Sequence, residues 1–296
     1  MMASGAVVLS ILLLAAPGAS PLPVRTVRVQ GVPLAYVEKG RGQPVVLLHG
    51  FGHDYRIWSA ELESLSKSYR VFAYSRRHNV PNPEREGGAD STDAVAVEDL
   101  AAFIRTLNLG RVHLIGHSAG AGIALLAARD HPRLVRSLIL AEPVVDSIIA
   151  ENAEAQALMA AIPFEEAGRL LQSGNVEGAA RLLAAAIIGR ENAYDALPPH
   201  IRQVFVENLP REMKAAASAP ADAERPFTCE DARRLHVPTL FIQGEVTLEL
   251  FRLAVEELRK CMPGSELAIL PGATHALELE NPAGFDEIVL KFLGRP

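Results

Sequence analysis

The part of the chain that most constrains the fold lies between Arg111 and Arg129 and reads RVHLIGHSAGAGIALLAAR. The apolar run 112–115 leads into Gly116-His117-Ser118-Ala119-Gly120, and an Ala/Leu-rich run follows, which predicts a buried strand, a tight turn and a helix. Glycines at positions 116 and 120 let the strand and the helix approach closely around the bend. We therefore expect a strand that ends at Ser118 and passes directly into a helix.

The spacing Gly-x-Ser-x-Gly is typical of a nucleophile elbow, where a strained turn exposes the serine hydroxyl above the edge of a sheet. An ordinary glycine-rich turn can have the same sequence, so the interpretation depends on whether the other catalytic groups that the serine needs occur elsewhere in the chain. A serine hydroxyl at neutral pH needs a base on a loop that can approach it from a neighbouring strand end. His275 meets this requirement, because it lies at the end of the stretch Pro271-Gly272-Ala273-Thr274-His275, directly after the last expected strand.

Apolar runs with strand character alternate with amphipathic runs along most of the chain. This alternation predicts an α/β fold with a mostly parallel, doubly wound sheet, in which chemistry lies at the carboxyl ends of the strands. The expected strands are 24–30, 34–38, 44–48, 70–74, 112–115, 134–141, 237–243 and 266–270, and the expected helices include 55–68, 92–107, 248–261 and 281–293.

Residues 144–225 differ from their surroundings, because they are rich in Ala, Glu and Leu. Breaks at Pro163, Gly174, Pro198-Pro199 and Pro210 predict several short helices and no strand. We expect a core made of residues 24–143 and 226–296, with residues 144–225 inserted after the sixth strand as a helical lid, here called the lid segment.

Residues 1–23 have the features of a leader. The run AVVLSILLLAA (6–16) and the small residues after it resemble a secretory signal peptide, although no Lys or Arg precedes the run. Export to the periplasm or the medium is therefore expected, and an uncleaved leader on a cytoplasmic protein is the alternative. The run is shorter than the ~20 apolar residues of a membrane-spanning helix, so no stable membrane span is predicted.

Charge and cysteine content narrow the classes of partner. The formal net charge is −6 and there is no cluster of Lys and Arg, which argues against nucleic acid or an anionic membrane surface as the main partner. The partner that we expect is a small-molecule substrate. The two cysteines, Cys229 and Cys261, lie outside any metal-binding spacing, so no metal site is predicted, and a disulfide between them is left open.

With His49-Gly50, the Ser118 elbow and His275 in this order, the chain resembles the α/β-hydrolase family from about Val24 to the C-terminus. The resemblance implies a mostly parallel eight-stranded sheet, a catalytic triad of serine, acid and histidine, and no cofactor. It also implies an oxyanion hole of two backbone N–H groups, which would be those of Phe51 and Ala119. His117 and the Phe51 side chain are expected to shape the elbow and the pocket.

The triad acid departs from the family's usual pattern, because Thr247 stands where an aspartate is common after the seventh strand. Glu142, at the end of the sixth strand, is the favoured acid, since some branches, the haloalkane dehalogenases among them, place it there. Glu245 and Glu249 are the alternatives, and Glu249 is explained equally well as a first-turn charge on a helix.

The loop after the fourth strand also departs from the family, with Arg76 and Arg77 in place of a glycine-rich turn. We expect solvated loop arginines, with binding of a substrate carboxylate as the alternative.

The resemblance implies a cofactor-free hydrolase of small or medium carboxylic esters or lactones, acting through an acyl-Ser118 intermediate. Amide, thioester and carbon–carbon bond hydrolysis, or a perhydrolase activity, would use the same triad. Dehalogenases and epoxide hydrolases attack through an aspartate, so serine at position 118 disfavours both. A ligand-binding protein that has lost catalysis is the alternative from another class.

Overall fold

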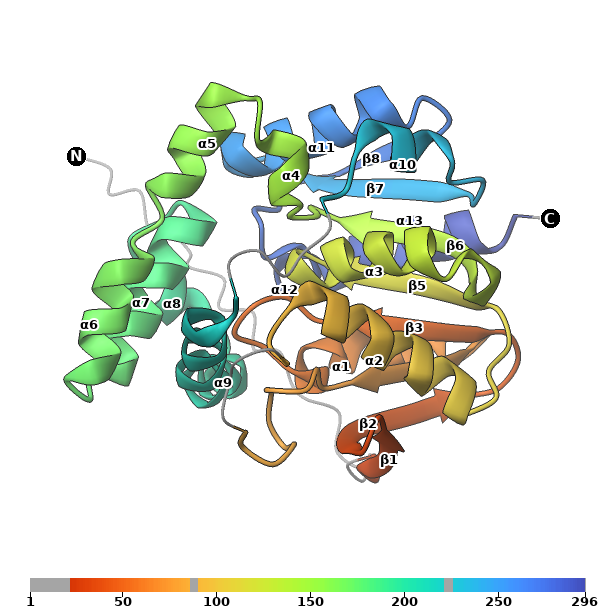
Figure 1. The fold of residues 1–296 in the computed structure, drawn as a ribbon, viewed down its shortest axis with the longest axis horizontal. Helices are drawn as coiled ribbons and strands as arrows, with labels where there is room; N and C mark the ends of the chain where they lie inside the picture. The colour runs from red at the N-terminus through yellow and green to blue at the C-terminus, as the bar shows by residue number, and fades with distance from the viewer. Residues whose placement is uncertain (1–21, 86–89, 221–225, 296) are drawn as a thin grey trace, which may run out of the picture.

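The computed structural model describes residues 22–85, 90–220 and 226–295. Most of the predicted leader, residues 1–21, lies outside the described residues. The strands form one sheet in the order β1-β2-β4-β3-β5-β6-β7-β8 (Figure 1). Their bounds are β1 (Arg25–Val29), β2 (Val32–Gly40), β3 (Pro44–Leu48), β4 (Arg70–Tyr74), β5 (Val112–His117), β6 (Val135–Ala141), β7 (Thr239–Gly244) and β8 (Glu266–Leu270).

Only β2 runs antiparallel to its neighbours, β1 and β4, and every pairing from β4 to β8 is parallel. The predicted fold class, a mostly parallel eight-stranded sheet, is therefore confirmed. The register pairs Leu48 with Gly116, His117 with Ala141, and Ala141 with Ile242. Four strands thus end at the same edge, and the residues that follow them meet there.

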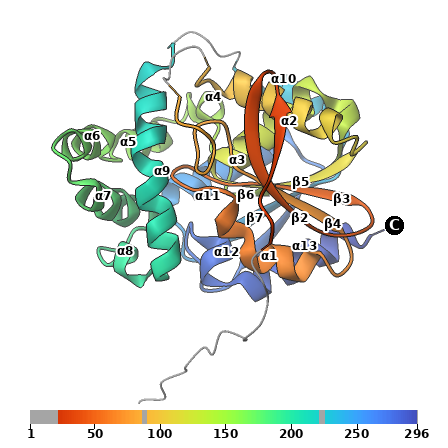
Figure 2. The ribbon, with the colours of Figure 1, turned by 90° about the horizontal axis from the view of Figure 1, so that it is seen from below.

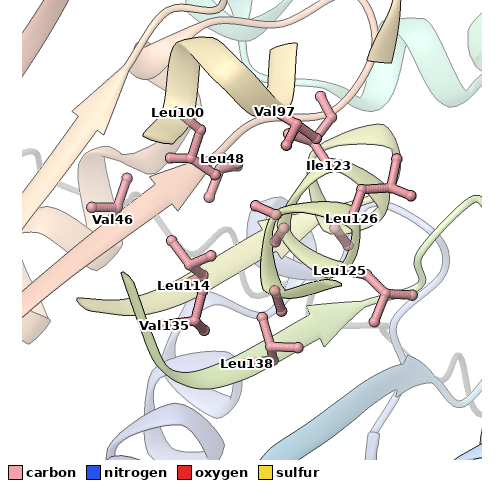
Figure 3. Packing of buried hydrophobic residues seen from close by; sticks show 14 of the residues in the cluster. Val46, Leu48, Val97, Leu100, Leu114, Ile123, Leu125, Leu126, Val135 and Leu138 are labelled. Atoms are coloured by element: carbon pink, nitrogen blue, oxygen red, sulfur yellow. The ribbon is translucent and has the colours of Figure 1, made fainter. Parts of the chain in front are cut away.

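Helices cover both faces of the sheet, because each face is lined by fully buried aliphatic and aromatic side chains. α2, α3, α10 and α11 contribute to the core on one face, and α1 and α13 pack on the other. Figure 3 shows aliphatic side chains of β3, β5 and β6 in contact with those of α2 and α3. The bounds are α1 (Ser59–Leu65), α2 (Asp93–Thr106), α3 (Ala119–Asp130), α10 (Cys229–Arg233), α11 (Glu249–Cys261), α12 (Leu277–Glu280) and α13 (Pro282–Leu293), with short 3-10 turns at Tyr55–Trp58 and Pro132–Leu134.

Between β6 and β7 the described residues form helices and no strand, as the composition of the lid segment predicts. Figures 1 and 2 show these helices beside the edge where the strands end. Whether they act as a lid stays a prediction. The helices are α4 (Asp146–Ile149), α5 (Ala153–Ala160), α6 (Phe164–Gln172), α7 (Val176–Ile188), α8 (Ala193–Ala196) and α9 (Pro199–Ser218).

One expected break in the lid segment is wrong, because α9 continues through Pro210. A proline inside a helix removes one hydrogen bond and costs about 3 kcal/mol. Here the helix is fixed on both sides of the proline, since Leu209 is fully buried and Glu212 binds the core. Tertiary contacts therefore outweigh the local cost.

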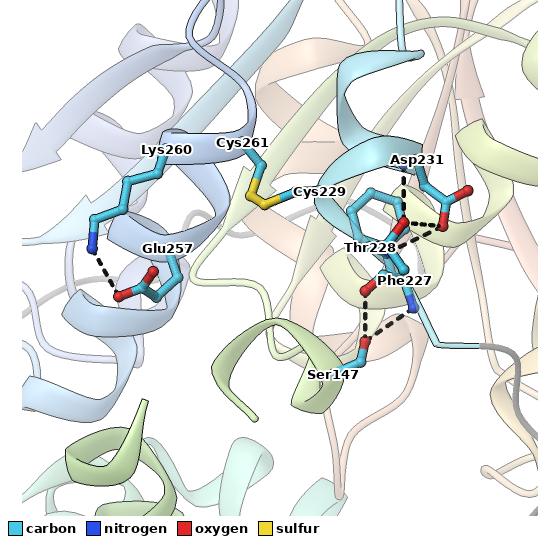
Figure 4. Close-up of a disulfide and its surroundings, with 8 residues drawn as sticks. All are labelled: Ser147, Phe227, Thr228, Cys229, Asp231, Glu257, Lys260 and Cys261. Atoms are coloured by element: carbon cyan, nitrogen blue, oxygen red, sulfur yellow. Dashed lines mark hydrogen bonds and ion pairs between the residues drawn. A yellow bond between two sulfur atoms is a disulfide. The ribbon is translucent and has the colours of Figure 1, made fainter. Parts of the chain in front are cut away.

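Cys229 and Cys261 form a disulfide, with their Cα atoms 4.9 Å apart (Figure 4). The bond joins the first residue of α10 to the last residue of α11. Close to it, Ser147 Oγ accepts from the Phe227 N–H and donates to the Phe227 carbonyl, at 3.0 Å each. The segment that returns from the lid to the core is thus fixed by one covalent bond and by these polar contacts. None of the helices in the described ranges is long and apolar enough to cross a membrane.

Candidate active site

Ser118 lies between β5 and α3 in a strained backbone conformation, with φ 53° and ψ −123°. A Cβ atom at position 116 would lie 2.5 Å from the Ala121 Cα atom, and one at position 120 would overlap the Leu48 carbonyl oxygen. Both positions therefore require glycine. The Ser118 N–H donates to the Ala141 carbonyl at 2.9 Å, which fixes the bend against β6. The elbow thus holds a strained serine at the strand ends.

The structure brings His275 and Glu142 together. His275 Nδ1 lies 2.6 Å from Glu142 Oε2, and both side chains are buried. Glu142 directly follows β6 and has φ 44°, a left-handed conformation that is uncommon for glutamate. Its Oε1 accepts from the Gly244 N–H at 2.8 Å, and its Oε2 accepts from the Thr247 hydroxyl at 2.9 Å. Thr247, at the position where the family resemblance led us to expect an aspartate, therefore donates a hydrogen bond to Glu142.

The alternative acids lie elsewhere. Glu245 is exposed and accepts from the Gly272 N–H at 2.8 Å, and Glu249 forms an ion pair with Arg252. Neither contacts His275 in the described part of the chain.

Burial controls the charges of the histidine and its acid. It raises the pKa of Glu142 to about 7, although the hydrogen bonds from Gly244 and Thr247 favour the carboxylate. Burial lowers the pKa of His275 well below its usual value, and nearby His117 acts in the same direction. The Phe251 ring stacks on His275 with centroids 3.5 Å apart and an interplanar angle of 7°, which covers one face of the imidazole. Burial and the neighbouring His117 therefore both favour the neutral form of His275.

Ser118 and His275 line one cavity of about 70 Å³. Its other walls are mostly apolar, and several come from the lid segment. The Ser118 hydroxyl makes no hydrogen bond to any other residue in the described ranges. The remaining lining residues are Phe51, His53, His117, Ala276 and Leu279 of the core, and Ala184, Ile187, Ile188, Leu197 and Phe205 of the lid segment.

The loop after β3 lies against the elbow. A Cβ atom at Gly50 would lie 3.2 Å from the Ser118 Cβ atom, so Phe51 follows a backbone that touches the serine. The Phe51 N–H donates to no other described residue. Ala119 is the first residue of α3, where N–H groups lack an acceptor within the helix. Both predicted oxyanion donors thus belong to segments beside Ser118, and their role stays a prediction.

The expectation of solvated arginines after β4 is wrong. Arg77 is 9% exposed, and its Nε and Nη2 bind the two Asp99 oxygens at 2.8 and 2.7 Å. Arg76 binds Glu212 of α9 and also donates to the Gly50 carbonyl at 3.2 Å. These acids stand on helices far away in sequence, so the loop alone did not reveal them. The Arg77 guanidinium is thus paired with Asp99 inside the fold, and Arg76 links the lid segment to the core.

Sequence reasoning missed three side chains around the site: Glu212, which holds the loop after β3, Phe251, which stacks on His275, and Glu278, which contacts His117. Each acts through a contact between segments far apart in sequence, and only Glu278, three residues after His275, had a nearby signal.

Comparisons with known proteins agree with this fold. A model described as the alpha/beta hydrolase family matches residues 45–288. The 2-(acetamidomethylene)succinate hydrolase of Mesorhizobium japonicum is 26% identical, over 90% of this chain and 92% of that protein. A thermophilic esterase from Thermogutta terrifontis superposes with a TM-score of 0.72 and 25% identity, over 92% of this chain and 98% of the esterase.

An epoxide hydrolase from Bacillus megaterium has a TM-score of 0.74 at 22% identity, over 92% of this chain and all of that one, which shows a shared fold alone. The family match covers most of the chain, and the relatives are named as hydrolases. The chain therefore belongs to the alpha/beta hydrolase family, and the protein is a hydrolase.

Proposed function

We propose that the protein is a cofactor-free serine hydrolase that cleaves a small carboxylic ester or lactone through an acyl-Ser118 intermediate. The observation that carries the proposal is the buried Glu142–His275 pair, whose histidine lines one cavity together with a serine in a strained elbow. A nucleophile, a base and a carboxylate that orients the base are the parts that acyl transfer requires.

In the first half-reaction, Ser118 Oγ attacks the ester carbonyl carbon and its proton passes to His275 Nε2. The negative charge on the carbonyl oxygen is stabilised by the N–H groups of Phe51 and Ala119. The tetrahedral intermediate then collapses: the bond to the leaving oxygen breaks, and that oxygen takes the proton from His275. An alcohol departs from an ester, whereas a lactone keeps its hydroxyl on the acyl chain.

In the second half-reaction, water attacks the acyl group and gives a proton to His275. The bond to Ser118 Oγ breaks, the serine recovers the proton, and a carboxylic acid leaves. Glu142 orients the imidazole in both steps by accepting the Nδ1–H, and its charge stabilises the imidazolium.

The cavity supports a short, uncharged acyl group. Its volume of about 70 Å³ is small, and its ionisable lining residues are histidines alone among the described residues. Five apolar lining residues come from the lid segment, so we expect that segment to set the acyl preference.

Hydrolysis of p-nitrophenyl esters of increasing acyl length and of a lactone series tests the proposal, with Ser118→Ala as the blank. Matched amides, thioesters and β-diketones in the same panel distinguish the alternative reactions. A fluorophosphonate probe should label Ser118, as mass spectrometry of the digested protein would detect. Folded protein that gains no adduct at Ser118 would favour the ligand-binding alternative.

We also propose export of the protein, on the leader expected over residues 1–23 and the Cys229–Cys261 disulfide. Disulfides persist in oxidising compartments and are rare in a reducing cytosol. Mass spectrometry of the intact protein from cell fractions would test this, because export predicts a shortened chain outside the cytoplasm.

A further inference from the structure

Behind the predicted catalytic histidine lies a second contact between a histidine and a carboxyl group. His117 Nε2 lies 2.8 Å from the His275 carbonyl oxygen, and His117 Nδ1 lies 3.1 Å from Glu278 Oε1. Glu278 stands on α12, three residues after His275, and both His117 and Glu278 are buried. The rings of His117 and His275 are 4.8 Å apart. The two side chains therefore join β5 to the loop that carries His275.

Hydrogen-bond geometry fixes the tautomer of His117. A carbonyl oxygen can only accept, so His117 Nε2 must carry a hydrogen in order to bind the His275 carbonyl. At His117 Nδ1, a lone pair facing a carboxylate oxygen at 3.1 Å would be repulsive, so the pair requires one proton between Nδ1 and Oε1, although the contact is not aligned as a hydrogen bond in the structure. The pair is then neutral overall, either as imidazolium with carboxylate or as imidazole with carboxylic acid.

The surroundings of Glu278 favour the carboxylic acid. Neither of its oxygens makes an aligned hydrogen bond to another described residue, so a carboxylate there would lack the donors that Glu142 has. The charged and titratable groups that interact with Glu278 are His117 of β5, Glu61 of α1, Glu142 after β6, and Glu280 on its own helix. Apart from His117 they are all acids.

Burial raises the pKa of Glu278, and Glu142 and Glu280 act in the same direction. Glu61 is also fully buried, neither of its oxygens has a hydrogen-bond partner among the described residues, and burial raises its pKa well above the usual value. Glu61 in turn faces Asp286 of α13. A negative charge on Glu278 would therefore have acids on several sides and a single possible counter-ion.

The reaction itself disfavours a charged His117. His275 becomes positively charged each time it accepts a proton, and an imidazolium 4.8 Å away would oppose that charge. A neutral His117 can hold the His275 carbonyl without this penalty.

We propose that Glu278 is a positioning residue that stays protonated and donates its proton to Nδ1 of a neutral His117, whose Nε2–H holds the His275 carbonyl. Two carboxyl groups then position His275 in opposite protonation states. Glu142 orients the ring as a carboxylate, and Glu278 fixes the backbone as an acid. The role in catalysis rests on the proposed function of His275, whereas the position of the proton does not.

The proton can be located without an activity assay. Long-range ¹H–¹⁵N spectra of protein labelled with ¹⁵N-histidine report which ring nitrogens carry hydrogen, and a His117→Gln variant identifies the His117 signals. We expect a neutral His117 ring protonated on Nε2 throughout pH 6 to 8. A ring protonated on both nitrogens at pH 7 would overturn the proposal.

Activity provides a second test that depends on the donor at position 278. Glu278→Leu has a similar size but no donor, and kcat should fall at least tenfold with KM within about threefold. Glu278→Gln can donate an N–H to Nδ1 but cannot carry a negative charge, so it should recover most of that loss. If Glu278→Gln is as impaired as Glu278→Leu, the charged form matters and the proposal is wrong.

Glu245→Gln is the matched control, because Glu245 is exposed and contacts neither histidine. Thermal melting checks that each variant is folded. If Glu278→Leu does not fold, the spectra of the unmodified protein still decide where the proton lies. Failure of the fluorophosphonate probe to label Ser118 would instead reject the proposed function, while the tautomer of His117 could still be measured.

Discussion

The buried carboxyl of Glu142 should make the stability of this protein fall as the pH rises. Activity should rise over the same pH range, because the role proposed for Glu142 requires the carboxylate. Burial raises the pKa of Glu142 to about 7 in the folded chain, against 4.5 for an ordinary glutamate. Between these values the folded chain holds a proton that the unfolded chain has released. The contribution of Glu142 to stability is therefore complete below pH 4.5, falls as the pH rises, and levels off above pH 7.

The size of this effect follows from the two pKa values. They differ by about 2.5 units, which corresponds to a change of about 3 kcal/mol in the free energy of unfolding. Glu142→Gln removes the titration and keeps the size of the side chain. Other buried groups, such as His53 and Glu61, titrate equally in both proteins and cancel in the difference.

Urea denaturation of both proteins at pH 5, 6, 7 and 8 measures the difference. The stability of Glu142→Gln relative to the unmodified protein should increase by about 2 to 3 kcal/mol from pH 5 to pH 8. Glu245→Gln is the control and should show a flat difference, because an exposed carboxylate is solvated in both states. A difference for Glu142→Gln that is constant within about 0.5 kcal/mol would refute the raised pKa and the burial argument behind it.

Three further predictions concern the groups around the site. Turnover of one ester should fall at least ~100-fold in Glu142→Gln and stay within about tenfold in Glu245→Gln, and the reverse order would mean that the acid follows β7. Thr247→Val removes a hydrogen bond to the Glu142 carboxylate worth about 1.5–3 kcal/mol, so the acid limb of the kcat/KM profile, expected near pH 7, should move up by at least ~1 unit. If the pKa of the acid limb does not change, a group other than Glu142 controls that limb. Glu212→Leu should lower kcat at least tenfold with little change in KM, because Glu212 accepts from the Gly52 N–H next to Phe51, and unaltered turnover would show that the loop needs no such support.

The local parts of this site could be predicted from the sequence. Ser118 was found because the strand, the turn and the helix around it are consecutive, and the glycines beside it are required by contacts within a few residues or with the next strand. His275 was predicted from its place after the last strand. Glu142 was proposed from the end of β6, once Thr247 was recognised as an unusual residue after β7.

The parts that depend on contacts between distant segments could not be predicted. The loop after β4 looks solvent-exposed in sequence, yet Asp99 of α2 and Glu212 of α9 bind its two arginines. Pro210 reads as a helix break, and only the packing of α9 against the core shows why the helix continues. In each case the stabilising free energy comes from contacts with residues that lie outside any short stretch of sequence around the element.

Two helices of the lid segment differ in how they contact the site, and this difference yields a final prediction. α9 holds the loop after β3 through Glu212 and also supplies Phe205 to the cavity wall, whereas α7 supplies Ile187 and Ile188 and makes no such polar contact with that loop in the described residues. Ile187→Ala should therefore change substrate choice without disturbing the predicted oxyanion donors.

Shortening the Ile187 side chain to alanine removes three carbons from the cavity wall, and each buried CH₂ of a substrate contributes about 0.8 kcal/mol, or about fourfold in kcat/KM. The preferred acyl chain of the p-nitrophenyl ester series should therefore lengthen by two or three carbons. The rate of Ser118 labelling by a small fluorophosphonate should stay the same, because that probe reports the nucleophile rather than the wall. An unchanged acyl preference would mean that the acyl group does not lie against Ile187, whereas slower labelling would show that α7 also supports the catalytic residues.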